Sequence, residues 1–467
     1  MAINLKPKMN CMNHTLNGKI PGLCILVMLL LMGCKKFLGV RLSETVVNPT
    51  TVTDFKEMLN HDSLALCNFI LADLMSDDVR MTDAMLQSDT SSFFAHDYLW
   101  AKDVWNMGDQ DFMYNNAYSR ILQMNIILSK IDEAQGDTKQ KNLLRAQAQI
   151  NRAWYYLQLA NLYGDHYQTA TAATALAVPL VLLPDANVLP ARATVQQVYD
   201  QIIKDLTAAV NSADLPAMGQ TIVQPGKAAG YALLARTYLF MGNYAAAETA
   251  AGAALELRST LLNYNTAYTM PGVLIDLSKN PETLLGRLCS DNSFLAKYSG
   301  ASFLISPALR DLFEDTDTRL TVNFGADGNY NTYQYGWQVF NYSVAVPELV
   351  LIKAECLARK ADTDGALSWI NRLRQNRLPG NSTPDNHDDV LKIVLEERRR
   401  ELFFHGGLRL FDLKRLNREA AYAQTPERMN DDNTTVLSTL APGSPRYLMQ
   451  FSPIIIANNP NIVPNNR

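Results

Sequence analysis

Apolar side chains recur at helical spacing along much of this chain, most clearly between residues 230 and 257. In the first half of this stretch they are Tyr231, Leu234, Ala235 and Tyr238, which fall at steps of three and four residues and are mostly large. Beyond Gly242 the same spacing is kept by alanines, at Ala247, Ala251 and Ala254. Large side chains on one helix can pack closely against alanines on another. The pattern therefore predicts two short helices that fold back on each other at Gly242.

The same arrangement returns near the C-terminus with one residue added at the turn. Its apolar positions are Leu349, Ile352 and Cys356, followed by Ala366, Ile370 and Leu373. The spacing resembles the tetratricopeptide repeat, a helix–turn–helix unit of about 34 residues that buries its apolar face by stacking on copies of itself. The alternative is an ordinary helical hairpin in an α-domain. The order of the matching positions, with a glycine at the turn, favours the repeat.

Other segments complete a mainly α fold. Helices are predicted at 53–59, 64–75, 111–131, 142–163, 195–209 and 389–404. Thr194 followed by Gln197 predicts a capping box at the start of one of them. Between 258 and 344 the helical period is lost, and Gly, Asn, Pro and aromatic residues dominate, with strand-like runs around 332–342. We interpret 53–257 as an N-terminal helical region, 258–344 as an irregular ligand-binding lobe with short strands, and 345–467 as C-terminal repeats and a tail.

The N-terminus has the features of an export signal. Lys6, Lys8 and Lys19 precede an apolar run from Ile20 to Met32, which is shorter than the ~20 residues of a membrane span. The run ends at Gly33-Cys34 and resembles the lipobox of bacterial lipoproteins. That resemblance implies a signal peptide at 1–33, cleavage before Cys34, acylation of its thiol and a lipidated tether at 34–52. A plain signal peptide and an uncleaved anchor are the alternatives, and translation starting at Met9 or Met12 is compatible with the same signal.

Composition narrows the class of protein. Of the 467 residues, 48% are hydrophobic and 19% are charged, which is typical of a folded globular protein. The net charge of −4 does not favour binding to nucleic acid, whose phosphates are negative. Beyond the leader, Cys67, Cys289 and Cys356 have no metal-ligand spacing and call for no disulfide framework.

The most unusual segment alternates acids and bases on the helix at 389–404. Its charged core consists of Glu397, Arg398, Arg399, Arg400 and Glu401. Because Arg398 shares a helix face with Leu391, Leu395 and Leu402, its guanidinium must be buried with a partner. We predict a structural ion-pair network there rather than a basic patch for phosphate or nucleic acid. Gly406-Gly407 is predicted to end the helix in left-handed conformation.

No catalytic constellation is found, so we expect a protein that is not an enzyme, that uses no cofactor and that has no metal-ligating motif; the sequence leaves a structural Ca²⁺ open. Asp73, Asp77 and Asp78 could supply the carboxylate pair of a glycosidase, but aspartates in such a loop more often face solvent or a cation. The sequence has no nucleophile elbow, zinc-protease helix, P-loop or dinucleotide fingerprint.

Aromatic residues in polar, glycine-containing stretches are the candidate ligand contacts. They are Trp100, Trp105, Tyr333, Tyr335 and Trp337. If 333–337 is a strand, its three aromatic rings project to the same side. Flat rings with a polar edge suit the face of a sugar or an extended peptide. For any single residue the alternative is core packing.

Taken in order, these segments resemble the SusD/RagB family of nutrient-binding outer-membrane lipoproteins. The matching segments are Gly33-Cys34, 114–132 with Asn125, 145–165 ending Leu162-Tyr163-Gly164-Asp165, 192–216 with Asp205-Leu206, 230–257, 347–377, 397–407, 410–415 and Asn459-Pro460-Asn461-Ile462-Val463. The resemblance implies four tetratricopeptide-like helix pairs carrying a variable ligand-binding lobe. It also implies a lipid-anchored protein of the outer membrane, facing outside, that passes oligosaccharides to a TonB-dependent β-barrel transporter. Peptide binding on the same architecture and a surface glycosidase are the alternatives.

Overall fold

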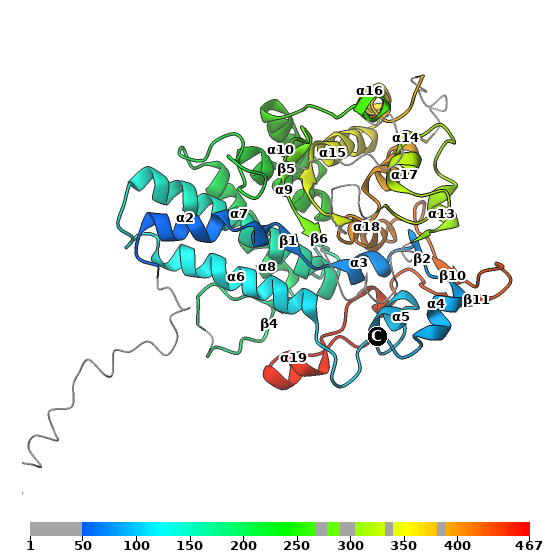
Figure 1. The fold of residues 1–467 in the computed structure, drawn as a ribbon, viewed down its shortest axis with the longest axis horizontal. Coiled ribbons are helices and arrows are strands. Elements are labelled where there is room, and N and C mark those ends of the chain that lie inside the picture. The colour runs from blue at the N-terminus through cyan, green and yellow to red at the C-terminus, as the bar shows by residue number, and fades with distance from the viewer. Residues whose placement is uncertain (1–48, 186, 268–277, 290–303, 332–339, 381–388) are drawn as a thin grey trace, which may run out of the picture. The chain divides into compact units, whose positions relative to one another are not determined.

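The computed structural model describes residues 49–185, 187–267, 278–289, 304–331, 340–380 and 389–467 (Figure 1). Helices are the main secondary structure of these residues. Residues 50–467 form one compact unit. The helices are α2 (Val52–Asn60), α3 (Ile70–Leu74), α4 (Asp83–Ser88), α5 (Phe93–Tyr98), α6 (Phe112–Lys130), α7 (Thr138–Tyr163), α8 (Val195–Val210), α9 (Lys227–Phe240), α10 (Tyr244–Leu257), α11 (Tyr264–Ala267), α13 (Pro307–Arg310), α14 (Thr318–Asn323), α15 (Val346–Arg359), α16 (Thr363–Arg374), α17 (Val390–Leu402), α18 (Leu408–Leu416) and α19 (Pro453–Asn458), with 3₁₀ turns at Asp62–Leu64 and Pro445–Tyr447. The mainly α fold class is therefore confirmed.

Helices that follow each other in the chain pack in pairs. The most extensive contacts between consecutive helices are α6–α7, α7–α8, α9–α10 and α15–α16, and α8 also contacts α9 while α10 packs against α15 (Figure 1). The hairpin predicted at 230–257 is α9–α10, and Gly242 at its turn has a φ of +71°. Gly230 lets α9 approach α8, since a Cβ added there would lie 2.5 Å from Val210 Cγ1. The small residues of the pattern thus set the distance between neighbouring helices.

Helix α7 lies at the centre of the scaffold. Every residue from Ile150 to Tyr163 is buried, so its polar side chains need internal partners. Arg152 donates to both oxygens of Asp205 on α8 at 2.8 Å, which joins the two helices by a bidentate ion pair. The capping box predicted at Thr194 and Gln197 is present at the start of α8.

The strands are short. They are β1 (Leu66–Cys67), β2 (Val79–Arg80), β3 (Leu176–Pro179), β4 (Arg192–Thr194), β5 (Thr283–Leu285), β6 (Leu288–Cys289), β7 (Leu304–Ile305), β8 (Phe340–Asn341), β9 (Val344–Ala345), β10 (Glu427–Met429) and β11 (Val436–Thr439). They form one three-stranded sheet, β1-β6-β8, and the two-stranded pairs β2-β7, β3-β4, β5-β9 and β10-β11.

The helix predicted at 64–75 is wrong for most of its length. Only Ile70–Leu74 is helical, and Leu66–Cys67 is a strand that pairs in parallel with Leu288–Cys289. A short apolar run is compatible with either a helix or a buried strand, and a partner more than 200 residues away decided it. Strand β2 likewise pairs with β7, so strands from the 258–344 region bind an early part of the chain.

Within the part of the chain that the structure describes, no helix is long and apolar enough to cross a membrane. Cys67, Cys289 and Cys356 are buried free thiols. The predicted signal peptide, the predicted anchor at Cys34 and nearly all of the predicted tether lie outside the described residues.

Candidate functional site

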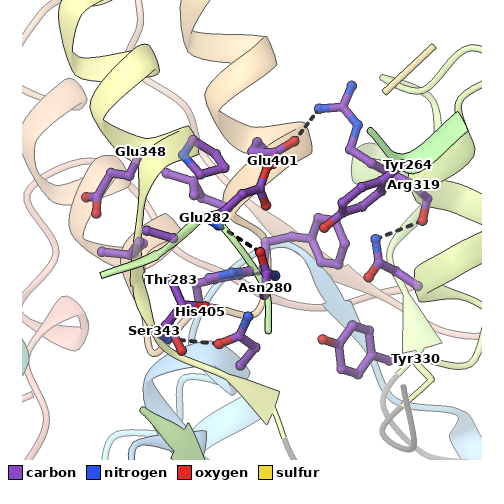
Figure 2. A pocket seen from close by; sticks show the side chains of 17 residues that line it. Tyr264, Asn280, Glu282, Thr283, Arg319, Tyr330, Ser343, Glu348, Glu401 and His405 are labelled. Carbon is purple, nitrogen blue, oxygen red and sulfur yellow. Dashed lines mark hydrogen bonds and ion pairs between the residues drawn. The ribbon is translucent and has the colours of Figure 1, made fainter. Parts of the chain in front are cut away.

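Two hollows adjoin the segment between 258 and 344. The first, which we call the polar pocket, lies between α14, α15, β9 and the turn from α17 to α18 and has a volume of about 50 Å³ (Figure 2). The second, which we call the β2–β10 groove, runs between β2, the start of α13 and β10 and has a volume of about 350 Å³.

The polar pocket is built around the guanidinium of Arg319. It donates to Asp317 Oδ1 at 3.0 Å and Oδ2 at 2.7 Å, and its Nη1 lies 2.8 Å from Glu397 Oε1 and 2.9 Å from Glu401 Oε2. Figure 2 shows the contact between Arg319 and Glu401 at the top of the pocket. Burial raises the pKa of the neighbouring Glu282, although Arg377 opposes this by donating to its Oε1 at 2.8 Å.

The size of the polar pocket decides what it can hold. A water molecule needs about 10–15 Å³ by this measure, so the pocket has room for a few waters. Pockets for small-molecule ligands measure about 300–1,000 Å³. The polar pocket is therefore too small for a sugar ring, and its paired charges join α14, α15 and α17.

All five charged residues at the core of the α17 segment form ion pairs, mostly with other elements. Glu397 contacts Arg319, Arg374 and Arg400, Arg398 contacts Asp412, Arg399 contacts Asp77 and Asp78, and Glu401 contacts Arg319 and Arg377. The side chain of Glu397 is fully buried. Burial alone would raise the pKa of Glu397, but the three guanidinium groups hold it well below its ordinary value. Gly406 and Gly407 follow with φ of +66° and +85°.

The prediction that these loop aspartates face solvent or a cation is wrong, because their carboxylates contact arginine side chains or backbone N–H groups of the protein. Asp78 is fully buried and accepts from Arg399 Nε at 2.7 Å, and Asp77 accepts from Arg409 through both oxygens at 2.7 and 2.8 Å. Burial favours a raised pKa for Asp77, and Arg399 and Arg409 overcome it and lower the pKa. Asp73 accepts backbone N–H bonds from Gly406 and Gly407, and burial raises its pKa to about 7.

Arg428 on β10 forms the floor of the β2–β10 groove. Its guanidinium lies between the rings of Tyr98, at 4.0 Å, and Trp100, at 4.2 Å. It donates to the backbone carbonyls of Tyr98, Val79, Leu74 and Ser76. Cation–π contacts and carbonyl acceptors replace the carboxylate that a buried arginine usually needs. The charge of Arg428 is therefore already solvated by protein groups.

Exposed side chains form the rim of the groove. They come from the start of α13 and from the segment that contains β10, and are Pro307, Ala308, Gln424, Thr425, Glu427 and Asn433. Amide and hydroxyl groups both donate and accept hydrogen bonds and a carboxylate accepts them, which suits a ligand covered with hydroxyl groups. Among the described residues, the structure contains no group of three or more His, Cys, Asp or Glu side chains placed to hold a metal ion.

The predicted aromatic contacts are placed as follows. Trp100 is fully buried and donates from Nε1 to Met75 O at 2.8 Å, so the prediction that it offers a ring to a ligand is wrong. Trp105 is also buried, packs on Phe93 and donates to Gln450 O at 2.8 Å, so the same correction applies. Both indoles complete the core because their N–H groups reach a carbonyl there. Tyr333, Tyr335 and Trp337 lie outside the described residues.

Sequence reasoning missed the groove, because its walls come from 77–80, 306–308, 424–429 and Asn433 and meet only in the fold. The one local signal was the turn-rich run Asn430-Asp431-Asp432-Asn433, which joins β10 to β11.

Two family models match the chain. Residues 36–239 match a model described as starch-binding and associating with the outer membrane, and residues 346–465 match the model of the SusD family. A comparison with curated proteins finds no match.

Solved structures share the fold. A Bacteroides vulgatus protein named as a candidate sugar-binding protein has a TM-score of 0.73 at 22% identity, over 90% of this chain and 99% of that one. A SusD superfamily protein from Bacteroides thetaiotaomicron has a TM-score of 0.71 at 21% identity, over 90% and 100%. A SusD-like carbohydrate-binding protein from Bacteroides vulgatus has a TM-score of 0.67 at 21% identity, over 88% and 97%.

Proposed function

The chain belongs to the SusD/RagB family, and from that premise we propose that it captures oligosaccharides in the β2–β10 groove without altering them. The observation that supports this choice of site is the groove itself. At about 350 Å³ it is within the range of ligand pockets, whereas the polar pocket is several times too small. Two of the solved structures that share the fold carry sugar or carbohydrate binding in their names.

Delivery and anchoring complete the proposal. The bound oligosaccharide passes to a TonB-dependent β-barrel transporter of the outer membrane, and acylated Cys34 holds the protein at the outer face of that membrane. The family model's description, which places its members at the outer membrane, supports the location. The lipobox at Gly33-Cys34 supports the anchor.

The test is isothermal titration of the purified protein with a panel of oligosaccharides, using a variant that fills the groove. Ala308 is exposed on the groove wall, so Ala308→Trp places an indole where the ligand would lie. We expect at least about a tenfold loss of affinity, which corresponds to ~1.4 kcal/mol. Ala245→Trp is the matched control, because Ala245 is equally an exposed alanine but lies on α10. Equal affinities for the two variants would refute the groove as the site.

Binding of extended peptides with no binding of any oligosaccharide would instead establish the peptide alternative. Turnover of labelled glycans by the purified protein would establish a surface glycosidase. Against that alternative, Asp77 and Asp78 are held in ion pairs and are not poised as acid and base.

We also propose that Tyr333, Tyr335 and Trp337 contribute to saccharide binding, on the strength of their spacing in the sequence. Trp337→Ala should then weaken oligosaccharide binding several-fold without changing the thermal midpoint of unfolding. An unchanged affinity would remove these residues from the site.

A further inference from the structure

The tip of the β10–β11 hairpin is fastened to the opposite wall of the β2–β10 groove by the carboxylate of Asp431. Its Oδ1 accepts a hydrogen bond from Arg80 Nη2 at 2.6 Å, and its Oδ2 accepts one from the backbone N–H of Asp83 at 3.0 Å. In return, the backbone N–H of Asp431 donates to Asp83 Oδ2 at 3.2 Å. Both oxygens of Asp431 are engaged, so the carboxylate is held facing Arg80.

Arg80 is the most exposed of the three arginines that line the groove. Its side chain is 31% exposed, against 9% for Arg399, and Arg428 is buried. The charge of Arg399 is balanced by Asp77 and Asp78. Arg428 donates to backbone carbonyls beneath the groove. Of these arginines, Arg80 is therefore the one most accessible to a ligand in the groove, and its guanidinium is paired with Asp431.

A guanidinium without a partner is the side chain best suited to bind a carboxylate, because it offers two parallel donors and a positive charge. Asp431 occupies that position at Arg80. A ligand carboxylate would have to displace Asp431 or lie against its negative charge, and either arrangement is unfavourable. Hydroxyl groups carry no charge and are not repelled by Asp431.

We infer that Asp431 makes the β2–β10 groove select uncharged saccharides and exclude acidic ones, an inference that rests on the proposed function. Asp431 is then a specificity-determining residue. The substrate class of the groove is neutral oligosaccharides, and those rich in hexuronic acid are bound weakly.

Titration of the purified full chain with matched saccharides tests this. The panel offers each hexuronic-acid oligosaccharide together with the same oligosaccharide after reduction of its carboxyl groups to neutral alcohols. We expect the wild type to prefer the reduced forms, and Asp431→Asn to shift the ratio of affinities toward the acidic forms by about tenfold. Asp432→Asn is the control, because it removes the same charge from the next residue, whose exposed carboxylate contacts Thr434 instead. The double variant Arg80→Gln/Asp431→Asn should lose the gain, since no guanidinium remains to receive the acid.

Three results overturn the inference while leaving saccharide binding intact. They are an unchanged ratio in Asp431→Asn, an equal shift in Asp432→Asn, and a wild type that prefers the acidic forms. Failure of the wild type to bind any member of the panel would overturn the proposed function and this inference with it. Retention of the neutral ligands by Asp431→Asn within a few-fold shows that the groove has kept its shape.

Discussion

Replacing Glu397 by glutamine tests whether the α17 ion-pair network stabilises the fold. The Glu397 carboxylate is fully buried, and its oxygens lie 2.8 Å from Arg319 Nη1, 3.0 Å from Arg374 Nη1 and 2.8 Å from Arg400 Nη2. Glutamine keeps the volume of the side chain and removes only its charge. The three guanidinium groups would remain in place with one anion fewer among them.

The expected magnitude follows from opposing contributions. Each guanidinium attracts the carboxylate by about 4 kcal/mol at 4 Å with an effective dielectric constant of about 20. Glutamine also avoids the cost of burying the carboxylate, which is several kcal/mol, and Glu401 and Asp317 still neutralise part of the charge on Arg319. Removing one partner of a buried pair costs about 3–5 kcal/mol in other proteins, and we expect Glu397→Gln to lower the free energy of unfolding by that amount.

Urea unfolding followed by circular dichroism measures the difference, and Glu396→Gln is the control. Glu396 is the preceding residue on the same helix and is only partly buried. A Glu397→Gln value within about 0.5 kcal/mol of the control would refute the reasoning, because surface substitutions commonly cause changes of that size. The pKa of Glu397 is lowered in the folded state, so its contribution is present above the unfolded pKa of about 4.5 and is lost as the pH falls toward the folded value. The difference between wild type and variant should therefore shrink in acid.

Three further predictions use single substitutions. Gly407→Ala should lower the free energy of unfolding by at least about 2 kcal/mol, because φ is +85° and the new Cβ would lie 2.5 Å from Ala72 Cβ. In the same urea assay, Gly252→Ala in α10, where a Cβ has open space, should raise the free energy of unfolding by about 0.5–1 kcal/mol. Burial raises the pKa of Asp97 from 3.8 to about 8 against the opposing charge of a nearby arginine, so the folded state holds the carboxyl proton more tightly than the unfolded state. The stability of the wild type should therefore fall relative to that of Asp97→Asn as the pH rises between those values. Parallel profiles of stability against pH for the two proteins would contradict this. Cys34→Ala should move the protein from the membrane fraction to the soluble or secreted fraction of its host, and a variant that stays with the membrane would exclude acylation at Cys34 as the anchor.

The long helices could be predicted from the sequence because their signals are local. Large residues before Gly242 and alanines after it, both at helical spacing, indicate two helices and the turn between them. Thr194 and Gln197 form a capping box from a spacing of three residues. The burial of Arg398 also followed from its neighbours, because Leu402 lies one turn away on the same face.

Side-chain contacts between segments that are distant in the sequence could not be predicted in the same way. Asp77 looked like a loop residue facing solvent, yet it pairs with Arg409, 332 residues later. Trp100 stood in a polar stretch that suited a ligand platform, but Arg428 from β10 covers its ring. In both cases the decisive contact joins segments whose separation in the sequence carries no periodic signal.

The sequence by itself determined the long helices, the turn between the two helices at Gly242, and that charged residues on α17 must be buried with partners. Periodicity reports which face of a helix avoids water, and that information is complete within a few turns. Only the tertiary structure decided which carboxylate meets which arginine, and that the walls at 77–80, 306–308 and 424–429 enclose a groove. Ion pairs and grooves depend on distances of a few ångströms between distant segments, and those distances are fixed only when the whole scaffold has packed.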